Sequence, residues 1–344
     1  MKITRWNCLK ATLVIAAALI AIAPLDSSAG VKLQGAGASF PAPLYLKWFK
    51  DYGAAHQNVQ IDYQSVGSGS GVKAVIDRTV DFGASDAAMT PEDMAKVKGG
   101  VQLLPMTAGS IVLTFNLEGV SELKLSRKVY TDIFLGKIKT WNDPAIASAN
   151  PGVKLPSTPI NVVVRADSSG TSFVFTKHLS AISPEFAKSP GTNTMPNWPV
   201  GTKSKGNEGV TASIKTTPGS IGYVEYGYAK SQKMPMATLE NKAGAYVAAT
   251  TASGQAGLAA VKMPDDLIAW VPDPEGKDAY SIVTYTWVIL YKQYADKQKL
   301  DAIQDVMKYG LGDGQKASES LGYIPLPASV VEKAKAALQN VKGQ

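Results

Sequence analysis

Hydrophobic positions along the chain follow two alternating patterns. Short runs rich in β-branched residues predict strands at 31–35, 59–66, 82–85, 111–116, 160–165, 221–225 and 281–290. Apolar residues that recur on one face predict helices at 43–55, 71–79, 300–309 and 328–338, and Thr90-Pro91-Glu92-Asp93 predicts another helix start. Such alternation is typical of an α/β fold with largely parallel sheets.

Two long segments interrupt this pattern. Residues 142–159 and 183–206 are rich in Pro, Asn and Ser and show no hydrophobic periodicity. The strand and helix patterns resume unchanged after each of them. We therefore interpret both segments as long surface loops and not as domain boundaries.

The N-terminus has the three parts of a secretory signal peptide. Lys2, Arg5 and Lys10 precede an apolar run at 11–23, which is too short to span a membrane. Small residues then lead to a predicted cleavage site after Ala29. An uncleaved membrane anchor is the alternative. The pattern therefore predicts export, with residues 1–29 removed.

Cysteine usage narrows the predicted compartment. The only cysteine, Cys8, lies before the apolar run, within the segment predicted to be removed. The mature chain would therefore have no disulfide, no reactive thiol and no lipid attachment site. A protein without these tethers needs an outer membrane to retain it, so we expect the periplasm.

The composition is that of a globular protein with a moderate positive charge. The chain has 344 residues and a formal net charge of +7, and it stays positive after removal of the predicted signal. This charge suits an anionic ligand, a nucleic acid or an acidic membrane surface. The sequence has no arginine-rich run and no basic stripe interleaved with aromatic residues, so we expect no nucleic-acid partner.

Three segments share one design, in which a strand ends, a Gly/Ser-rich turn follows and a helix begins. They are Gly35-Ala-Gly-Ala-Ser39-Phe40-Pro41, Val66-Gly-Ser68-Gly-Ser-Gly71 and Arg165-Ala-Asp167-Ser-Ser169-Gly170-Thr171. Helix N-termini carry unpaired N–H groups and partial positive charge, which makes them anion sites. Each turn alone could be only a helix cap. Three of them together favour an anion site at the carboxyl ends of the strands.

Three charged residues accompany these turns. Arg165 could hold two oxygens of a tetrahedral anion at once, and Asp167 could orient it. Asp86 follows a predicted strand and could accept a hydrogen bond from a protonated phosphate oxygen, which sulfate cannot offer. An ordinary surface ion pair and a simple turn cap are the alternatives for Arg165 and Asp86.

The chain resembles the phosphate-binding protein of the bacterial phosphate ABC transporter. The segments that carry the resemblance are Gly35-Ala-Gly-Ala-Ser-Phe-Pro-Ala-Pro43, Val80-Asp-Phe-Gly-Ala-Ser-Asp86, Leu135-Gly-Lys-Ile-Lys139, Arg165-Ala-Asp-Ser-Ser-Gly-Thr-Ser-Phe-Val-Phe-Thr176 and Ile221-Gly-Tyr-Val-Glu-Tyr226. These segments run from near the mature start to beyond residue 220, and the length of the chain also agrees, so the resemblance covers nearly the whole mature chain.

The resemblance implies a two-lobe periplasmic binding protein fold of type II, with a hinge and a ligand cleft between the lobes. Lobe one would comprise residues 30–107 and 285–344, and lobe two residues 108–284. It implies delivery of inorganic phosphate to membrane permease subunits by a monomer, without a cofactor or a metal. The implied phosphate contacts are Ser39, Phe40 through its N–H, Ser68, Asp86, Arg165, Ser169, Gly170 and Thr171, with Asp167 bracing Arg165.

Three other functions compete with this interpretation. An enzyme acting on phosphate esters would need a nucleophile beside a base or a metal, but His56 and His178 lie far apart in sequence without metal-ligand spacing. A receptor for another oxyanion, such as sulfate or molybdate, would conflict with Asp86. An adhesin is disfavoured because the chain is neither repetitive nor lipidated. We expect a binding protein and not an enzyme.

Overall fold

Eight strands form one curled, mixed sheet in the computed structural model of the protein, which describes residues 30–344. The predicted signal peptide lies outside the described residues. In spatial order the strands are β2 (Val59–Ser65), β1 (Val31–Gly37), β3 (Phe82–Ser85), β11 (Val283–Tyr291), β4 (Val101–Asn116), β8 (Ser220–Glu225), β6 (Asn161–Arg165) and β7 (Thr202–Ser204).

The sheet is only partly parallel. The pairs β1–β2, β1–β3, β6–β8 and β6–β7 are parallel, as the alternating pattern predicts. The central pairs β3–β11, β11–β4 and β4–β8 are antiparallel. The expectation of largely parallel sheets therefore holds at both ends of the sheet and is wrong at its centre.

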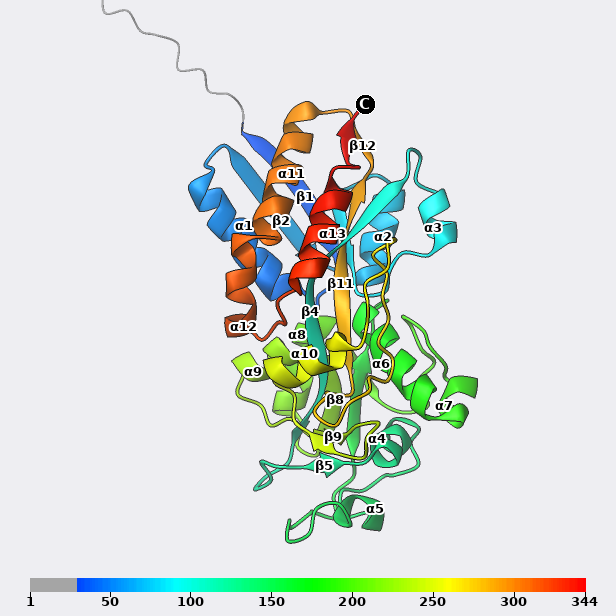
Figure 1. The fold of residues 1–344 in the computed structure, drawn as a ribbon. Coiled ribbons are helices and arrows are strands. Elements are labelled where there is room, and N and C mark those ends of the chain that lie inside the picture. The colour runs from blue at the N-terminus through cyan, green and yellow to red at the C-terminus, as the bar shows by residue number, and fades with distance from the viewer. Residues whose placement is uncertain (1–29) are drawn as a thin grey trace, which may run out of the picture.

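Helices pack around the two ends of the sheet and create two α/β lobes, one above the other in Figure 1. The upper lobe carries α1 (Ala42–Ala55), α2 (Ser68–Ile76), α3 (Pro91–Ala95), α11 (Lys297–Gly310), the 3-10 helix η1 (Asp313–Ala317), α12 (Ser318–Leu321) and α13 (Ala328–Leu338). The lower lobe carries α4 (Arg127–Phe134), α5 (Pro144–Ala147), α6 (Gly170–Ile182), α7 (Pro184–Lys188), α8 (Gly206–Thr216), α9 (Tyr226–Ser231) and α10 (Thr251–Ala259).

Five short strands form two small sheets beside the main one. A three-stranded sheet lies in the lower lobe, and a two-stranded sheet ties the C-terminus to the upper lobe (Figure 1). Their strands are β10 (Tyr246–Val247), β9 (Thr238–Glu240) and β5 (Lys124–Leu125), and β12 (Gln293–Tyr294) and β13 (Lys342–Gly343).

Strand β4 is the main connection between the lobes. It has 16 residues, and its first part pairs with β11 as far as Ser110, whereas Ile111 to Asn116 pair with β8. The hydrophobic pattern predicts only the second part. Pro105, Thr107 and Gly109 interrupt the first part, so a run of buried polar and small residues obscures the strand.

The ends of several elements differ from the sequence-based expectation. Strand β3 and helix α13 have the predicted bounds, whereas α2 begins at Ser68, three residues before the expected start. The segments interpreted as long loops contain α5, α7 and β7, so that interpretation is wrong in part. Asp143 and Ser183 cap the two helices, each followed by a proline at the first helical position, a signal that was available in the sequence.

The core is continuous through both lobes. Aromatic side chains such as Trp48, Tyr63 and Phe82 fill it in the upper lobe, and Phe134, Phe175 and Tyr223 fill it in the lower lobe. Among residues 30–344, every helix is too short or too polar to serve as a membrane span.

Candidate functional site

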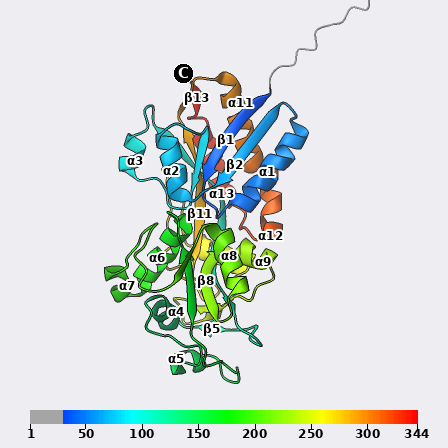
Figure 2. The same cartoon turned by 180° about the vertical axis from the view of Figure 1, so that it is seen from behind.

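Four junctions between a strand and a helix meet where the lobes touch. Three are the predicted ones: β1–α1 carries Ser39 and Phe40, β2–α2 carries Ser68, and β6–α6 carries residues 169–171. The fourth is β7–α8, with Asn207 at its helix start. In Figure 2, α2 of the upper lobe lies directly above α6 of the lower lobe. The helix N-termini therefore concentrate unpaired N–H groups and positive potential in one place.

The upper-lobe residues of the site are fully buried. Ser39 and Ser68 are each 1% exposed, and Phe40 is inaccessible to solvent. The Ser68 hydroxyl accepts a hydrogen bond from the backbone N–H of Asp86 over 3.2 Å. This bond holds the end of β3 against the start of α2, which fixes Asp86 beside the β2–α2 turn.

Arg165 supplies the positive charge, and Asp167 holds it in place. The side chain of Arg165 is 1% exposed, so the pair is not an ordinary surface ion pair. Arg165 Nε donates to Asp167 Oδ1 over 2.8 Å, and Nη2 donates to Oδ2. One edge of the guanidinium is thus bound to Asp167, and Nη1 on the other side donates to Thr171 Oγ1 over 3.3 Å.

Asp167 is kept ionised by the same contacts. Burial alone would raise the pKa of its carboxyl, but hydrogen bonds and charge from Arg165, together with the Gly206 N–H at 3.0 Å, lower the pKa below its ordinary value. An ionised Asp167 cancels part of the charge of Arg165. The guanidinium can therefore be buried without a bound anion.

Asp86 has a very different environment. Its Oδ1 accepts from Thr286 Oγ1 over 2.8 Å, and its Oδ2 lies 3.5 Å from Thr171 Oγ1. Burial raises the pKa of Asp86 to about 7, against the opposing effects of the Thr286 bond and of Arg165. The carboxyl group is therefore close to half-protonated near neutral pH. Although Asp86 belongs to the upper lobe, its side chain also reaches Thr171 of the lower lobe.

The start of α6 packs tightly against the upper lobe. A Cβ on Gly170 would lie 2.5 Å from Ser68 Oγ and 2.7 Å from Asp86 Cβ, which only glycine avoids. Ser169 caps α6, because its Oγ accepts from the Ser172 N–H over 3.0 Å. Ser169 is thus a helix cap, which was the alternative interpretation of this turn. Its hydroxyl proton is still available to another acceptor, because the cap uses the oxygen only as an acceptor.

Three further buried residues lie in this region, and the sequence patterns predicted no role for them. Asn207 bonds to Ser39 and Thr171, and Thr286 bonds to Asp86. Glu225 is fully buried at the end of β8, where burial raises its pKa well above the ordinary value. Glu225 belongs to a quoted motif, but Asn207 follows a segment interpreted as a loop, and Thr286 is hidden in an apolar strand.

The two histidines lie outside this cluster of residues. His178 is buried, with Nε2 2.8 Å from Tyr130 Oη and Nδ1 2.7 Å from the Pro272 carbonyl, and burial lowers its pKa to about 4. His56 is exposed and stacks on Tyr52 at the end of α1. Both ring nitrogens of His178 are thus engaged in holding the lower lobe together.

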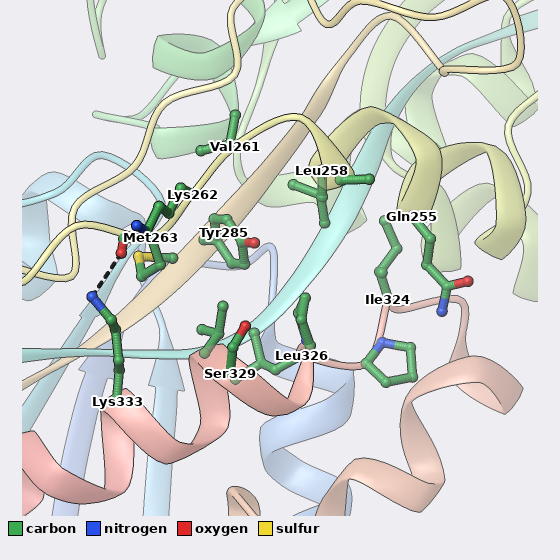
Figure 3. Close-up of a pocket in the computed structure, with 14 residues that line it drawn as sticks. Gln255, Leu258, Val261, Lys262, Met263, Tyr285, Ile324, Leu326, Ser329 and Lys333 are labelled. Carbon is green, nitrogen blue, oxygen red and sulfur yellow. Dashed lines mark hydrogen bonds between the residues drawn. The ribbon is translucent and has the colours of Figure 1, made fainter.

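A cavity lies apart from this site, beside β11 and between α10 and α13 (Figure 3). It has a volume of about 550 Å³ and mainly apolar walls that include Leu258, Met263, Tyr285 and Ile324. Lys333 at its rim donates to the Met263 carbonyl over 3.0 Å. None of the predicted site residues lines this cavity.

Metal binding is not indicated in the part of the chain that the structure describes. No group of three or more His, Cys, Asp or Glu side chains between residues 30 and 344 could hold a metal ion. The groups gathered where the lobes touch provide hydrogen bonds and charge: hydroxyl and backbone donors, the guanidinium of Arg165, and the carboxyl groups of Asp86, Asp167 and Glu225.

Several known proteins similar to this chain are described as phosphate-binding proteins. A family model described as a PBP superfamily domain matches residues 24–313. The phosphate-binding protein PstS of Xylella fastidiosa (strain Temecula1) is 39% identical over 315 residues, which is 90% of this chain and 86% of that protein. The PstS protein of Pasteurella multocida is 40% identical over 310 residues, which is 88% of this chain and 89% of that protein.

A solved structure has the same fold. The phosphate-binding protein from Stenotrophomonas maltophilia matches with a TM-score of 0.71 and 21% sequence identity. The match covers 89% of this chain and 94% of the other. At this identity the likeness concerns the architecture of two lobes around a mixed sheet.

Proposed function

This chain belongs to the PstS phosphate-binding protein family, and from that premise we propose that it captures inorganic phosphate and delivers it to an ABC transporter for import. The observation that carries the proposal is the meeting of four helix N-termini and one buried, braced arginine where the lobes touch. Such a set of donors suits a small tetrahedral anion with most of its hydration removed.

The proposed ligand contacts come from both lobes. Ser39, Phe40, Ser68 and Asp86 act from the upper lobe, and Arg165, Ser169, Gly170 and Thr171 act from the lower lobe. Seven of these supply donors, and Asp86 supplies an acceptor for a proton-bearing oxygen of phosphate. Because ligand contacts on both lobes form together only when the lobes are closed, phosphate favours the closed form.

We place the lobe boundaries in the two long strands. Lobe one, the upper lobe, takes residues 30–107 and 285–344, and lobe two takes residues 108–284. Support comes from β4, which exchanges its partner β11 for β8 between Ser110 and Ile111. A hinge in continuous strands would let the lobes rotate without breaking the sheet at either end.

Calorimetry on protein stripped of carried-over ligand tests the proposed function. Phosphate should bind tightly with a stoichiometry of one, and sulfate should bind far more weakly. Binding of sulfate or molybdate in preference to phosphate would show that the site is specific for another oxyanion. Turnover of a phosphate ester in a metal-supplemented assay would favour an enzyme, although the engaged ring nitrogens of His178 argue against it as a catalytic base.

We also propose that the protein works in the periplasm as a monomer and docks onto membrane permease subunits. Export should remove the first 29 residues, so that the mature chain begins at or within a few residues of Gly30. N-terminal sequencing of protein from a periplasmic extract measures this. Membrane-bound protein that retains Met1 would contradict the prediction.

Arg165→Lys is expected to weaken phosphate binding although it keeps the charge. Lysine offers a point charge and cannot bind Asp167 along one edge while donating to an anion along the other. The loss should be about 1–3 kcal/mol, measured by calorimetry. Arg127→Lys is the matched control, because Arg127 makes an equivalent pair with Asp273, at 2.7 and 2.8 Å, outside the four junctions. Equal losses of phosphate affinity in the two variants would show that Arg165 does not bind the phosphate.

A further inference from the structure

Asn207 joins the two lobes through hydroxyl groups proposed to bind phosphate. It is the second residue of α8 and is fully buried. Its backbone N–H and its Nδ2 both donate to Ser39 Oγ, over 3.1 and 2.9 Å. Nδ2 also donates to Thr171 Oγ1 over 3.1 Å. Ser39 belongs to the upper lobe and Thr171 to the lower, so one amide group contacts both.

The direction of the amide is fixed by a neighbour. The backbone N–H of Glu225 donates to Asn207 Oδ1 over 2.8 Å. A backbone N–H can only donate, so the amide oxygen must face Glu225 and the NH₂ group must face the two hydroxyls. Asn207 is therefore a donor to Ser39 and Thr171, and never an acceptor from them.

This direction decides where the hydroxyl protons can point. A hydroxyl has one proton to donate and two acceptor positions. Both acceptor positions of Ser39 Oγ are taken by Asn207, so only the proton remains for a ligand. Thr171 Oγ1 likewise accepts from Asn207 and from Arg165 Nη1, and its proton makes only a long contact of 3.5 Å to Asp86. An anion requires donors, and both hydroxyls are left as donors.

We propose that Asn207 is a positioning residue that turns the protons of Ser39 and Thr171 toward the bound phosphate and links the closed lobes. The inference rests on the proposed function and adds a residue that does not touch the ligand. Because its partners lie on both lobes, the contacts with Ser39 are made only in the closed form. Asn207 thus adds to the affinity by favouring closure as well as by orienting donors.

A double-mutant cycle with inorganic phosphate tests this role. Asn207→Ala should lower the affinity measured by calorimetry about tenfold, as expected for the loss of the side-chain hydrogen bonds to the hydroxyls of Ser39 and Thr171. In a Ser39→Ala background the same change should cost less than about threefold, because residues that share a hydrogen bond are not additive. A purely structural role for Asn207 would give equal losses in both backgrounds and would overturn the proposal.

Asn207→Asp provides the second variant, since aspartate keeps the size of the side chain but accepts where asparagine donates. It should pull the Ser39 proton away from the cleft and lower phosphate affinity by about a hundredfold or more. Asn116→Asp is the matched control: Asn116 Nδ2 holds the other end of the same helix through the carbonyls of Ile214 and Lys215, both at 3.0 Å. Its affinity should equal that of the wild type.

The outcomes separate this inference from the proposed function. Failure of the wild-type protein to bind phosphate would reject the function itself. Wild-type binding that is unchanged in Asn207→Asp would reject only the role of Asn207. Small-angle scattering with and without phosphate gives an independent readout, because Asn207→Asp should reduce the compaction that phosphate causes in the wild-type protein. If phosphate compacts Asn207→Asp as much as it compacts the wild-type protein, Asn207 does not link the closed lobes.

Discussion

Replacing Asp86 by asparagine is expected to raise the affinity for sulfate by about tenfold to thirtyfold at pH 8.5, because it removes a like-charge contact that the wild-type protein can relieve only by protonating a carboxyl whose pKa is about 7. Phosphate affinity should fall much less than sulfate affinity rises. The ionised carboxyl of Asp86 can only accept hydrogen bonds, and phosphate near neutral pH carries a proton to offer it. Sulfate carries none, so two dehydrated negative groups would face each other in a buried site.

The expected selectivity depends on pH because Asp86 titrates near neutrality. Burial raises its pKa to about 7, so the carboxyl is mostly ionised above pH 7 and mostly protonated below it. The protonated form can donate to a sulfate oxygen. Sulfate should therefore bind the wild-type protein more tightly at pH 5.5 than at pH 8.5, whereas Asp86→Asn should lose this dependence. Sulfate itself does not titrate in this range, so the change reports on the protein.

Competition binding of both anions at the two pH values measures these effects. Asp81→Asn is the matched control, because Asp81 precedes the same strand β3 but pairs with Lys299 at 2.7 Å on the side away from the cleft residues. The phosphate-to-sulfate preference of the control should stay at the wild-type value. If Asp86→Asn keeps the wild-type preference too, Asp86 does not discriminate between the anions.

Gly170→Ala is expected to weaken phosphate binding by about tenfold to a hundredfold, the effect of overpacking by about 1–3 kcal/mol. The added methyl group would lie 2.5 Å from Ser68 Oγ and 2.8 Å from the backbone N of Asp86. Those atoms belong to the upper lobe, and Gly170 starts a helix of the lower lobe. The substitution therefore opposes closure of the lobes, and each lobe should keep its own stability.

Calorimetry and scattering on the same samples check this prediction. Gly209→Ala in α8 is the matched control, since a Cβ there meets its nearest neighbours at an ordinary 3.7 Å. Alanine is also the better helix former at both positions, so thermal unfolding of the empty proteins should not fall. Wild-type affinity in Gly170→Ala would mean that the lobes need not approach as closely as the structure shows.

Local patterns were sufficient for the elements that depend on local chemistry. The bounds of β3 and α13 are confirmed, and Thr90 caps α3 by accepting from the Asp93 N–H, as its position before a proline predicts. Elements whose stability comes from distant partners were not predictable in the same way. The first part of β4 contains Pro105 and Gly109, and it is a strand because β11 pairs with it.

The same division applies to the candidate site. The three Gly/Ser-rich turns and the pair of Arg165 with Asp167 follow from short motifs, because a strand–turn–helix unit carries its own hydrogen-bond donors. Their roles as phosphate contacts remain predictions. Thr286 could not be found from the sequence, since nothing in an apolar strand marks the one hydroxyl that reaches Asp86.

The sequence by itself determined the α/β class, the family and the residue types that can hold an anion, because these follow from periodicity and motifs within short stretches of chain. Only the tertiary structure decided how these groups act on one another. The pKa of Asp86 is raised because neighbouring segments exclude water from it. Asn207 contacts Ser39, 168 positions away in the sequence, because the two lobes come together. Desolvation and hydrogen-bond direction arise from neighbours in space, which no local pattern encodes.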